Sequence, residues 1–312
     1  MSFDADVHEL GDGLFAYVQG DGGWGLSNAG LVTADGVSML IDTLFDLRCA
    51  RRMFDALATV TADHPIDAAV NTHGNGDHCF GNALLPKSIP VYATAAADAE
   101  LRLATPAVVA GLENIDDSPE WRAFWSRTFG RFDFSEVELR PPTETFTGQL
   151  DLKIGDREVT LIEVGPAHTA GDAILVVPDA EVTFTGDILF SGGTPIVWHG
   201  PVQNWLDACD RIERFAPRVL VPGHGQICGS GGLEDTRRYL SYVRDQAQAR
   251  FLDGMSAIDA ADDIDIGDFR DWGDPERIVV NVETVYRELE PGRSAPSPPE
   301  LFLRMARWAA RH

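Results

Sequence analysis

The sequence contains no run of 18 or more apolar residues, which excludes a helix long enough to span a bilayer. Its acidic first residues also lack an apolar segment of signal-peptide length. Cysteine is scarce, and the four residues, at positions 49, 79, 209 and 228, show no pairwise motif spacing. In a chain of this length they are expected to be buried thiols and not a disulfide framework. We therefore expect a cytoplasmic protein with no membrane partner.

The sequence also has few basic residues. The chain has 25 lysines and arginines against 49 acidic residues, which gives a net charge of -24. A field of this sign repels phosphate backbones, so the composition argues against a nucleic-acid partner. A small-molecule substrate is the partner that we expect, and homo-oligomer formation stays open.

Short apolar runs that alternate with helical patterns make up most of the chain. With 44% hydrophobic residues and a length of 312, the sequence can bury the core of one large domain over residues 1–312. Strands are expected at 14–18, 28–32, 38–42, 68–71, 152–154, 159–164, 173–177, 182–185 and 218–221. Helices are expected at 47–60 and 202–215. The repeated alternation predicts an α/β fold.

Two regions are predicted to be mainly helical. Residues 95–135 form a helical insertion rich in aromatic residues, among them Trp121 and Trp125. This insertion either packs on the core or roofs an apolar substrate pocket. Residues 232–312 form a C-terminal helical extension.

Histidine and aspartate follow apolar strands in four segments, at 71–78, 165–169, 185–187 and 221–225. Each segment has a nearby glycine, which lets the backbone turn tightly and the side chain project into a shared cleft. One histidine after a strand is usually an ordinary polar residue. Four such segments in series predict a metal site, because imidazole and carboxylate are common zinc ligands.

These motifs resemble those of the metallo-β-lactamase superfamily: a His-x-His-x-Asp-His cluster, a later His, an Asp after Gly, and a final Gly-His. The resemblance spans residues 73–224 and implies a four-layer αββα sandwich with two divalent metal ions between the sheets. The implied ions are zinc, with iron or manganese as alternatives. Carried over by position, the ligands are His73 and His168 for the first metal, Asp77, His78 and His224 for the second, and Asp187 as the bridge.

One ligand position departs from the superfamily pattern, because Asn75 stands where the second histidine of the cluster is expected. An amide oxygen is a weaker zinc ligand than imidazole. Asn75 therefore either ligates weakly, hydrogen-bonds a metal-bound water, or leaves the first site poorly filled, as in a single-metal or inactive enzyme. Asp42 matches the first motif of the superfamily, which implies that it supports the cluster loop from behind. A strand-end cap is its competing role.

The implied reaction is attack of a metal-bound hydroxide on a carbonyl carbon, with Asp77 as the catalytic proton carrier. The segment 192–202 follows Asp187 and is expected to border the metals. Trp198 and His199 are therefore candidate pocket residues, together with Trp121 and Trp125. Core packing for Trp198 and a surface role for His199 are equally compatible with the sequence. A large apolar pocket would suit a bulky acyl substrate.

The sequence also resembles, less specifically, the metallo-β-lactamase-like cyclase/thioesterases of aromatic polyketide pathways. The similar segments are 27–30, 140–142, 164–169, 191–195 and 275–281. The sequence thus predicts a metal-dependent hydrolase of an ester, thioester or lactone carbonyl. The alternatives are a polyketide cyclase with the metals as Lewis acid, a di-iron oxygenase, and a non-catalytic binding protein.

Overall fold

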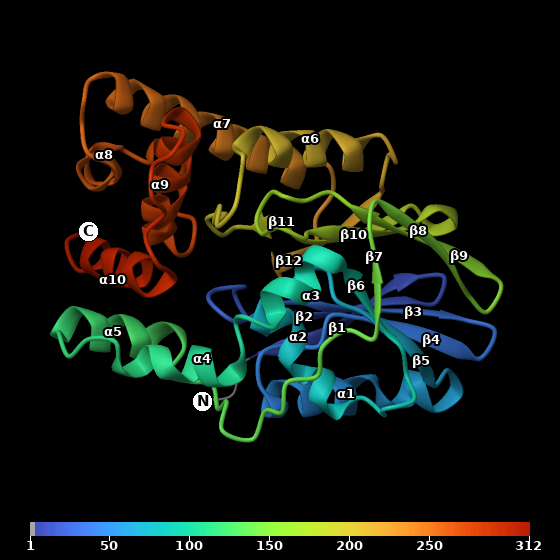
Figure 1. The fold of residues 1–312 in the computed structure, drawn as a ribbon. Coiled ribbons are helices and arrows are strands. Elements are labelled where there is room, and N and C mark those ends of the chain that lie inside the picture. The colour runs from blue at the N-terminus through green and yellow to red at the C-terminus, as the bar shows by residue number, and fades with distance from the viewer. Residues whose placement is uncertain (1–3) are drawn as a thin grey trace.

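The computed structural model describes residues 4–312 and has two β-sheets packed face to face between layers of helices (Figure 1). In this described part the first sheet has seven strands in the order β1 to β7. Strands β1 to β4 are antiparallel, and β4 to β7 are parallel. Their bounds are Ala5–Gly11, Leu14–Gln19, Ala29–Ala34, Val37–Ile41, Ile66–Val70, Val91–Thr94 and Glu144–Phe146.

Residues 4–312 place five strands in the second sheet, in the order β12-β11-β10-β9-β8. Strands β11 and β12 are parallel, and the other pairs are antiparallel. The bounds are Gln149–Ile154 for β8, Arg157–Glu163 for β9, Ala173–Val177 for β10, Val182–Ser191 for β11 and Val219–Gly225 for β12.

Helices cover the outer face of each sheet, as Figure 1 shows. Helix α1 (Leu47–Asp63) lies under the first sheet, and α6 (Val202–Glu213) and α7 (Gly231–Leu252) lie over the second. Asp46 begins α1, because its Oδ1 accepts a hydrogen bond from the Cys49 amide at 2.7 Å. The expected αββα sandwich is therefore the fold of this chain.

The core between the sheets is built from the inward-facing positions of both. Leu14 and Met39 of the first sheet meet Leu161, Val182 and Phe184 of the second, and each of the five is at most 2% exposed. Full burial of such a side chain stabilises the fold by about 1.5–3 kcal/mol. Because this core fixes one sheet against the other, side chains at the shared edge have defined relative positions.

The remaining helices include five that gather at one end of the sandwich, at the left in Figure 1. The insertion contributes α4 and α5, and the C-terminal region contributes α8 to α10, with α10 packed against α5. Short helices α2 and α3 follow β5 and β6. The bounds are Gly76–Cys79 (α2), Ala95–Leu101 (α3), Pro106–Gly111 (α4), Pro119–Thr128 (α5), Ala257–Asp263 (α8), Ile278–Leu289 (α9) and Pro298–Ala309 (α10).

The strands, the cysteines and the helix lengths each bear on an expectation from the sequence. Strands β1, β6 and β7 were not among the expected strands; β1 pairs with β2 along the edge of the first sheet. All four cysteines are free, and three of them are buried. Across residues 4–312, no helix is both long and apolar enough to cross a membrane.

Candidate metal centre

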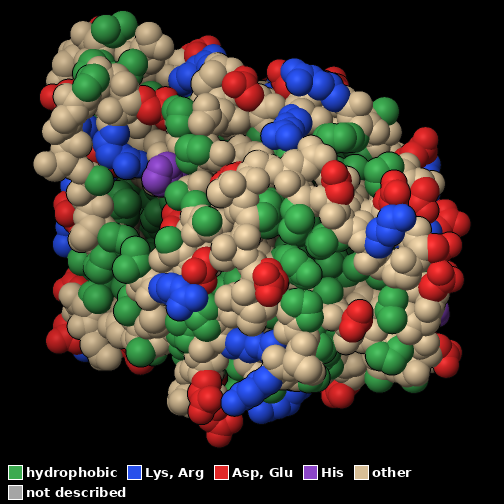
Figure 2. All heavy atoms as spheres, turned by 45° about the vertical axis from the view of Figure 1, so that its right-hand side comes forward, with side chains coloured by type: hydrophobic (Ala, Val, Ile, Leu, Met, Phe, Trp, Pro, Cys, Tyr) green, Lys and Arg blue, Asp and Glu red, His purple; other side chains and the backbone are tan. Residues whose placement is uncertain are grey.

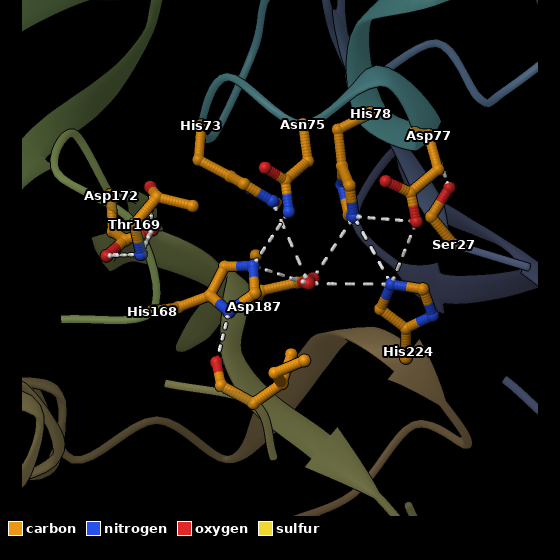
Figure 3. Close-up of polar contacts among 12 residues, drawn as sticks. Ser27, His73, Asn75, Asp77, His78, His168, Thr169, Asp172, Asp187 and His224 are labelled. Atoms are coloured by element: carbon orange, nitrogen blue, oxygen red, sulfur yellow. Dashed lines mark hydrogen bonds and ion pairs between the residues drawn. The ribbon is translucent and has the colours of Figure 1, made fainter. Parts of the chain in front are cut away.

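The candidate ligands come from both sheets and meet at one edge of the sandwich. His73 follows β5, and Asp77 and His78 lie on the one-turn helix α2. His168 lies in the loop after β9, while Asp187 and His224 come from β11 and β12. Figure 3 shows these six side chains pointing toward a common centre. The structure thus brings together residues that lie up to 151 positions apart, from 73 to 224.

The local backbone at Asp187 and His224 differs from the sequence prediction. Both residues were expected at strand exits, but β11 continues to Ser191 and β12 to Gly225, so both lie within strands. The β11 ladder is irregular at Gly186, whose φ of +50° suits glycine. At Gly223 a Cβ atom would lie 1.9 Å from Asp187 Oδ1. These two glycines therefore let the carboxylate of Asp187 reach the centre.

Asp187 is the hub of the arrangement and is 4% exposed. The Nε2 atom of His78 lies 3.1 Å from its Oδ1. The Nε2 atoms of the other three histidines lie near its Oδ2, at 3.3 Å for His168, 3.5 Å for His224 and 3.7 Å for His73. One carboxylate thus faces four imidazoles, which is the position required of a bridging ligand.

Asp77 completes the second half of the centre. Its Oδ2 lies 3.3 Å from His224 Nε2 and 4.0 Å from His78 Nε2. The Nε2 atoms of His78 and His224 are 3.4 Å apart. Ligand atoms of Asp77, His78 and His224 lie within 4.8 Å of one another, as do those of His73, His78 and Asp187. Each group has its ligand atoms close enough together for a cation, and the two groups share His78.

The four imidazoles are oriented by hydrogen bonds at Nδ1, which leave Nε2 directed into the centre. Such outer contacts fix the ring and its tautomer in metal sites. The Nδ1 partners are Thr72 Oγ1 for His73 (3.0 Å), Asp42 Oδ2 for His78 (2.7 Å), Ile196 O for His168 (2.7 Å) and Gly22 O for His224 (3.0 Å).

Asp42 supports the cluster loop at two points. Besides His78, it accepts hydrogen bonds from the amide and the hydroxyl of Thr72, each at 2.8 Å. Its own φ of +59° is unusual for a residue other than glycine. The side chain therefore links the end of β4 to the loop after β5.

The loop that carries His168 is held by Asp172, a buried acid near the centre (Figure 3). Its carboxylate accepts hydrogen bonds from the Thr169 hydroxyl at 2.6 Å, the Thr169 amide at 2.9 Å and the Ala167 amide at 3.2 Å. Burial raises the pKa of Asp172 to about 8, against the lowering effect of Thr169. The sequence analysis did not identify this residue.

Charge in the centre is shared among buried groups. Burial lowers the pKa of His73 and His168. Burial also opposes charge on His224, but the carboxylates of Asp187 and Asp77 raise its pKa to about 9. Burial alone would raise the pKa of Asp77, whereas His78 and His224 lower it to about 2. The centre therefore keeps its carboxylates ionised and suits cations.

The hydrogen bonding of His73 and the types of side chain in the centre also fit a bound metal ion. His73 Nε2 is buried and has no hydrogen-bond partner within residues 4–312. An unpartnered buried nitrogen is costly, and a cation in the centre would be its partner. Imidazole nitrogens and carboxylate oxygens are suitable ligands for zinc and for other first-row divalent metals.

Asn75 also points into the centre, on the side of His73 and His168 (Figure 3). Its Nδ2 atom lies 3.0 Å from His168 Nε2. Rotation of the side-chain amide by half a turn would place its carbonyl oxygen, instead of Nδ2, toward the centre. The side chain of Asn75 therefore lies within hydrogen-bonding distance of one candidate ligand.

A cavity of about 630 Å³ opens directly onto the centre. Asn75, Asp77, His168, Asp187 and His224 line it, and its other walls are mostly apolar. Figure 2 shows a hollow with hydrophobic walls on this face. The apolar walls come from the loops after β2, β4 and β11, from α4 and the turn after it, from the residue that follows α5 and from α10. They include Trp24, Phe45, Val108, Val109, Leu112, Phe129, Trp198 and Phe302.

The structure places only one of the four predicted pocket residues on these walls. Trp198 lines the cavity, whereas Trp121, Trp125 and His199 do not. Trp121 is fully buried, and its ring stacks on Phe124 with centroids 5.7 Å apart. Its Nε1 donates to the Glu113 carbonyl, so the tryptophans form the aromatic core behind the wall. His199 is exposed.

Helix α9 clamps the segment that orients His168, which the sequence analysis missed. Asn281 accepts a hydrogen bond from the Val197 amide at 2.7 Å and donates to the Pro195 carbonyl at 2.8 Å. Thr284 donates to the Val197 carbonyl at 2.7 Å. The Ile196 carbonyl that binds His168 lies between these contacts. Segments 191–195 and 275–281 were noted only for their resemblance to the cyclase/thioesterases, and nothing in them indicated that they contact each other.

The chain spans less than half of the curated relatives that it matches. It is 29% identical over 122 residues to human (Homo sapiens) acyl-coenzyme A thioesterase MBLAC2, covering 37% of this chain and 40% of that protein. It is 29% identical over 117 residues to a linear primary-alkylsulfatase from a Pseudomonas strain, covering 34% of this chain and 22% of the relative.

Two solved structures have similar folds at low sequence identity. A stereoselective inverting sec-alkylsulfatase from Pseudomonas sp. aligns with a TM-score of 0.68 and 18% identity, covering 94% of this chain and 52% of that one. A metallo-β-lactamase from Pseudomonas aeruginosa in its mono-zinc form aligns with a TM-score of 0.57 and 20% identity, covering 76% and 95%. The model of the metallo-beta-lactamase superfamily matches residues 22–224, well over half of the sequence, and the chain therefore belongs to that family.

Proposed function

We propose that this protein is a metal-dependent hydrolase that attacks the carbonyl carbon of a bulky apolar acyl compound and breaks its ester C–O or thioester C–S bond. The observation that carries the proposal is the direct opening of the six-residue metal centre into a large apolar cavity. Such a cavity binds a hydrophobic acyl group by removing its apolar surface from water, and places its carbonyl at the centre.

The candidate residues have separate roles in metal binding and proton transfer. His73, His168 and Asn75 would hold the first cation, Asp77, His78 and His224 the second, and Asp187 would join both. When bound, two such cations lower the pKa of water, polarise a carbonyl oxygen and offset negative charge in the transition state. Asp77 borders the cavity as an ionised carboxylate, and it is placed to accept a proton and pass it to the leaving group.

The relatives support acyl chemistry and leave sulfate-ester cleavage as the second candidate. The thioesterase match favours an acyl thioester. The alkylsulfatase matches, one of which covers 94% of this chain, favour an apolar alkyl sulfate in the same cavity. A polyketide cyclase would use the same cavity without net hydrolysis. We propose zinc as the metal, since nitrogen ligands outnumber carboxylates in the centre.

A combined metal and substrate assay tests the proposal. The purified protein is analysed for metal content and then assayed with acyl 4-nitrophenyl esters, acyl thioesters, lactones and alkyl sulfates of increasing chain length. We expect ester or thioester turnover that rises with chain length and is abolished by a chelator. Asp187→Ala should lose metal and turnover together, while Asp235→Ala, on the exposed surface of α7, should keep both.

The results separate the candidates. Turnover restricted to alkyl sulfates would favour the sulfatase. Ring closure of a poly-β-keto thioester without release of acid would favour the cyclase. Turnover that survives full removal of metal would refute a metal-dependent reaction altogether.

A further inference from the structure

Five charged side chains line the cavity, and four of them have clear partners. Asp77 and Asp187 belong to the metal centre. Arg277 forms an ion pair of 2.8 Å with Asp274. Glu283 is held by Arg293 at 2.8 Å and Arg304 at 3.0 Å, neither of which lines the cavity.

Arg287 is the fifth, and no carboxylate of residues 4–312 lies within 4.0 Å of its guanidinium nitrogens. Its Nη2 donates to two neutral oxygens, the Thr284 hydroxyl at 2.7 Å and the Trp198 carbonyl at 3.2 Å. Its Nε is buried without a partner. Glu288, the next residue of α9, accepts a hydrogen bond from the Val202 amide instead.

A half-buried guanidinium that forms no direct ion pair is energetically costly, since burial removes hydration that only the more distant Glu288 carboxylate offsets. The chain could easily neutralise it, because the sequence has 49 acidic residues against 25 basic ones. A positive charge that lines an apolar cavity in so acidic a protein therefore indicates an anionic ligand. Figure 2 shows basic side chains at the edge of the hydrophobic hollow.

The guanidinium lines the same cavity as the metal centre and is connected to it through the backbone of Trp198. Trp198, whose carbonyl it binds, donates its own amide hydrogen to the His168 carbonyl at 3.0 Å. The Trp198 ring packs on Phe302 with centroids 5.5 Å apart, so the charge borders the aromatic wall. Leu103 and Val108 also line the cavity, although they are 77% and 53% exposed, and this gives it an apolar rim.

We infer that Arg287 binds a carboxylate carried by the substrate, so that the substrate is an amphiphile with one anionic group and a long apolar part. This inference rests on the proposed function and names the substrate class of that site. A charge-assisted hydrogen bond of this kind is worth about 1.5–3 kcal/mol, which corresponds to a preference of about 10- to 150-fold for the anionic substrate.

The kinetic test uses the full-length, metal-loaded protein and two matched esters. One is the mono-4-nitrophenyl ester of a ten-carbon dicarboxylic acid, and the other is the same ester with its free carboxylate capped as a methyl ester. We expect wild type to favour the anionic ester in kcat/KM by at least tenfold, as the energy above implies. Arg287→Met should abolish this preference, measured as the ratio of the two kcat/KM values within each variant, while Arg287→Lys should retain part of it.

Arg214→Met is the matched control, because it removes one positive charge from an exposed position that does not line the cavity. It should leave the preference unchanged. An equal kcat/KM for the two esters in wild type, or the same preference in Arg287→Met, would overturn the inference.

Calorimetry separates the inference from the proposed function. Binding of decanoate and decanamide is measured on metal-loaded wild type, Arg287→Met and Arg214→Met. If wild type binds decanoate more tightly than decanamide and Arg287→Met does not, the anionic subsite is supported, whether or not the esters are hydrolysed. Absence of ester hydrolysis would count only against the proposed hydrolase function. If Arg287→Met still binds decanoate more tightly than decanamide, by the same factor as wild type, the metals cause the difference in affinity. That result would overturn the subsite.

Discussion

At the scale of single residues, Asn75 is the one ligand position that departs from the superfamily pattern. Its amide reaches to 3.0 Å from His168 Nε2, so a side chain of similar reach can contribute to the first metal. We expect Asn75→His to raise the affinity for the first cation by about tenfold or more, since imidazole is the better ligand. Metal titration with elemental analysis measures this change.

The matched control for that substitution is Asn75→Ala, which should lower the occupancy of the first site and leave the second site filled. If both variants bind the first metal as wild type does, Asn75 does not lie at a ligand position.

Asp172 acts on the centre through the backbone of the His168 loop. Removal of its carboxylate in Asp172→Ala leaves the Thr169 amide and hydroxyl without their acceptor, while the Ala167 amide keeps its 2.9 Å hydrogen bond to the Thr169 carbonyl. We expect metal affinity to fall by about 10- to 100-fold, as for other outer supports of ligands. Thr169→Val removes only the hydroxyl contact and should have a smaller effect. Equal metal affinity in wild type and Asp172→Ala would exclude this positioning role.

At the scale of elements, sequence patterns predicted the strands better than the contacts between distant helices. The runs at 14–18, 38–42 and 173–177 match β2, β4 and β10 closely, because a buried strand needs apolar residues at adjacent positions. The His and Asp motifs identified the metal centre for a related reason. Metal ligands are restricted to a few residue types, and glycines mark the turns that expose them.

The clamp of α9 on residues 194–198 had no comparable signal. Asn281 and Thr284 hydrogen-bond to backbone groups, and any residue type can supply these groups. The partner segment lies more than 80 positions away, so pairing depends on the tertiary fold. Trp121 and Trp125 were wrongly expected in the pocket, because local aromatic density does not show whether a helix faces the cavity or the core, and no residue of α5 lines the cavity.

The clamp yields a prediction for Asn281, which is 1% exposed and makes three hydrogen bonds. Asn281→Ala leaves the Val197 amide unpartnered, and we expect the free energy of unfolding to fall by about 1–3 kcal/mol. Metal affinity should fall with it, since the Ile196 carbonyl loses its fixed position. Thermal unfolding and metal titration measure the two effects.

Tyr239→Phe is the control for this change, because it removes the Asn281 contact that does not involve residues 194–198. It should lower stability slightly and leave metal affinity unchanged. If Asn281→Ala binds metal as tightly as wild type, the clamp supports only the fold.

At the scale of the whole molecule, the metal centre joins the two halves of the sandwich. His73, Asp77 and His78 follow a strand of the first sheet, whereas Asp187 and His224 lie in strands of the second. Bound cations therefore link the sheets at the edge where the cavity opens. Because unfolded chains bind them weakly, cations stabilise the native state by RT ln(1 + [metal]/Kd), about 4 kcal/mol at a thousandfold excess over Kd.

Removal of the metals should accordingly lower the thermal stability of the whole domain. We expect a chelator to reduce Tm by about 8–15 °C, from the linkage energy and the usual 2–4 °C per kcal/mol for a domain of this size. Added zinc should restore Tm, and Asp187→Ala should show the lower Tm with or without chelator. Hydrogen exchange should show the loss of protection concentrated at β5, α2 and the bulged part of β11. A wild-type Tm that is insensitive to chelation would mean that packing between the sheets alone holds this edge together.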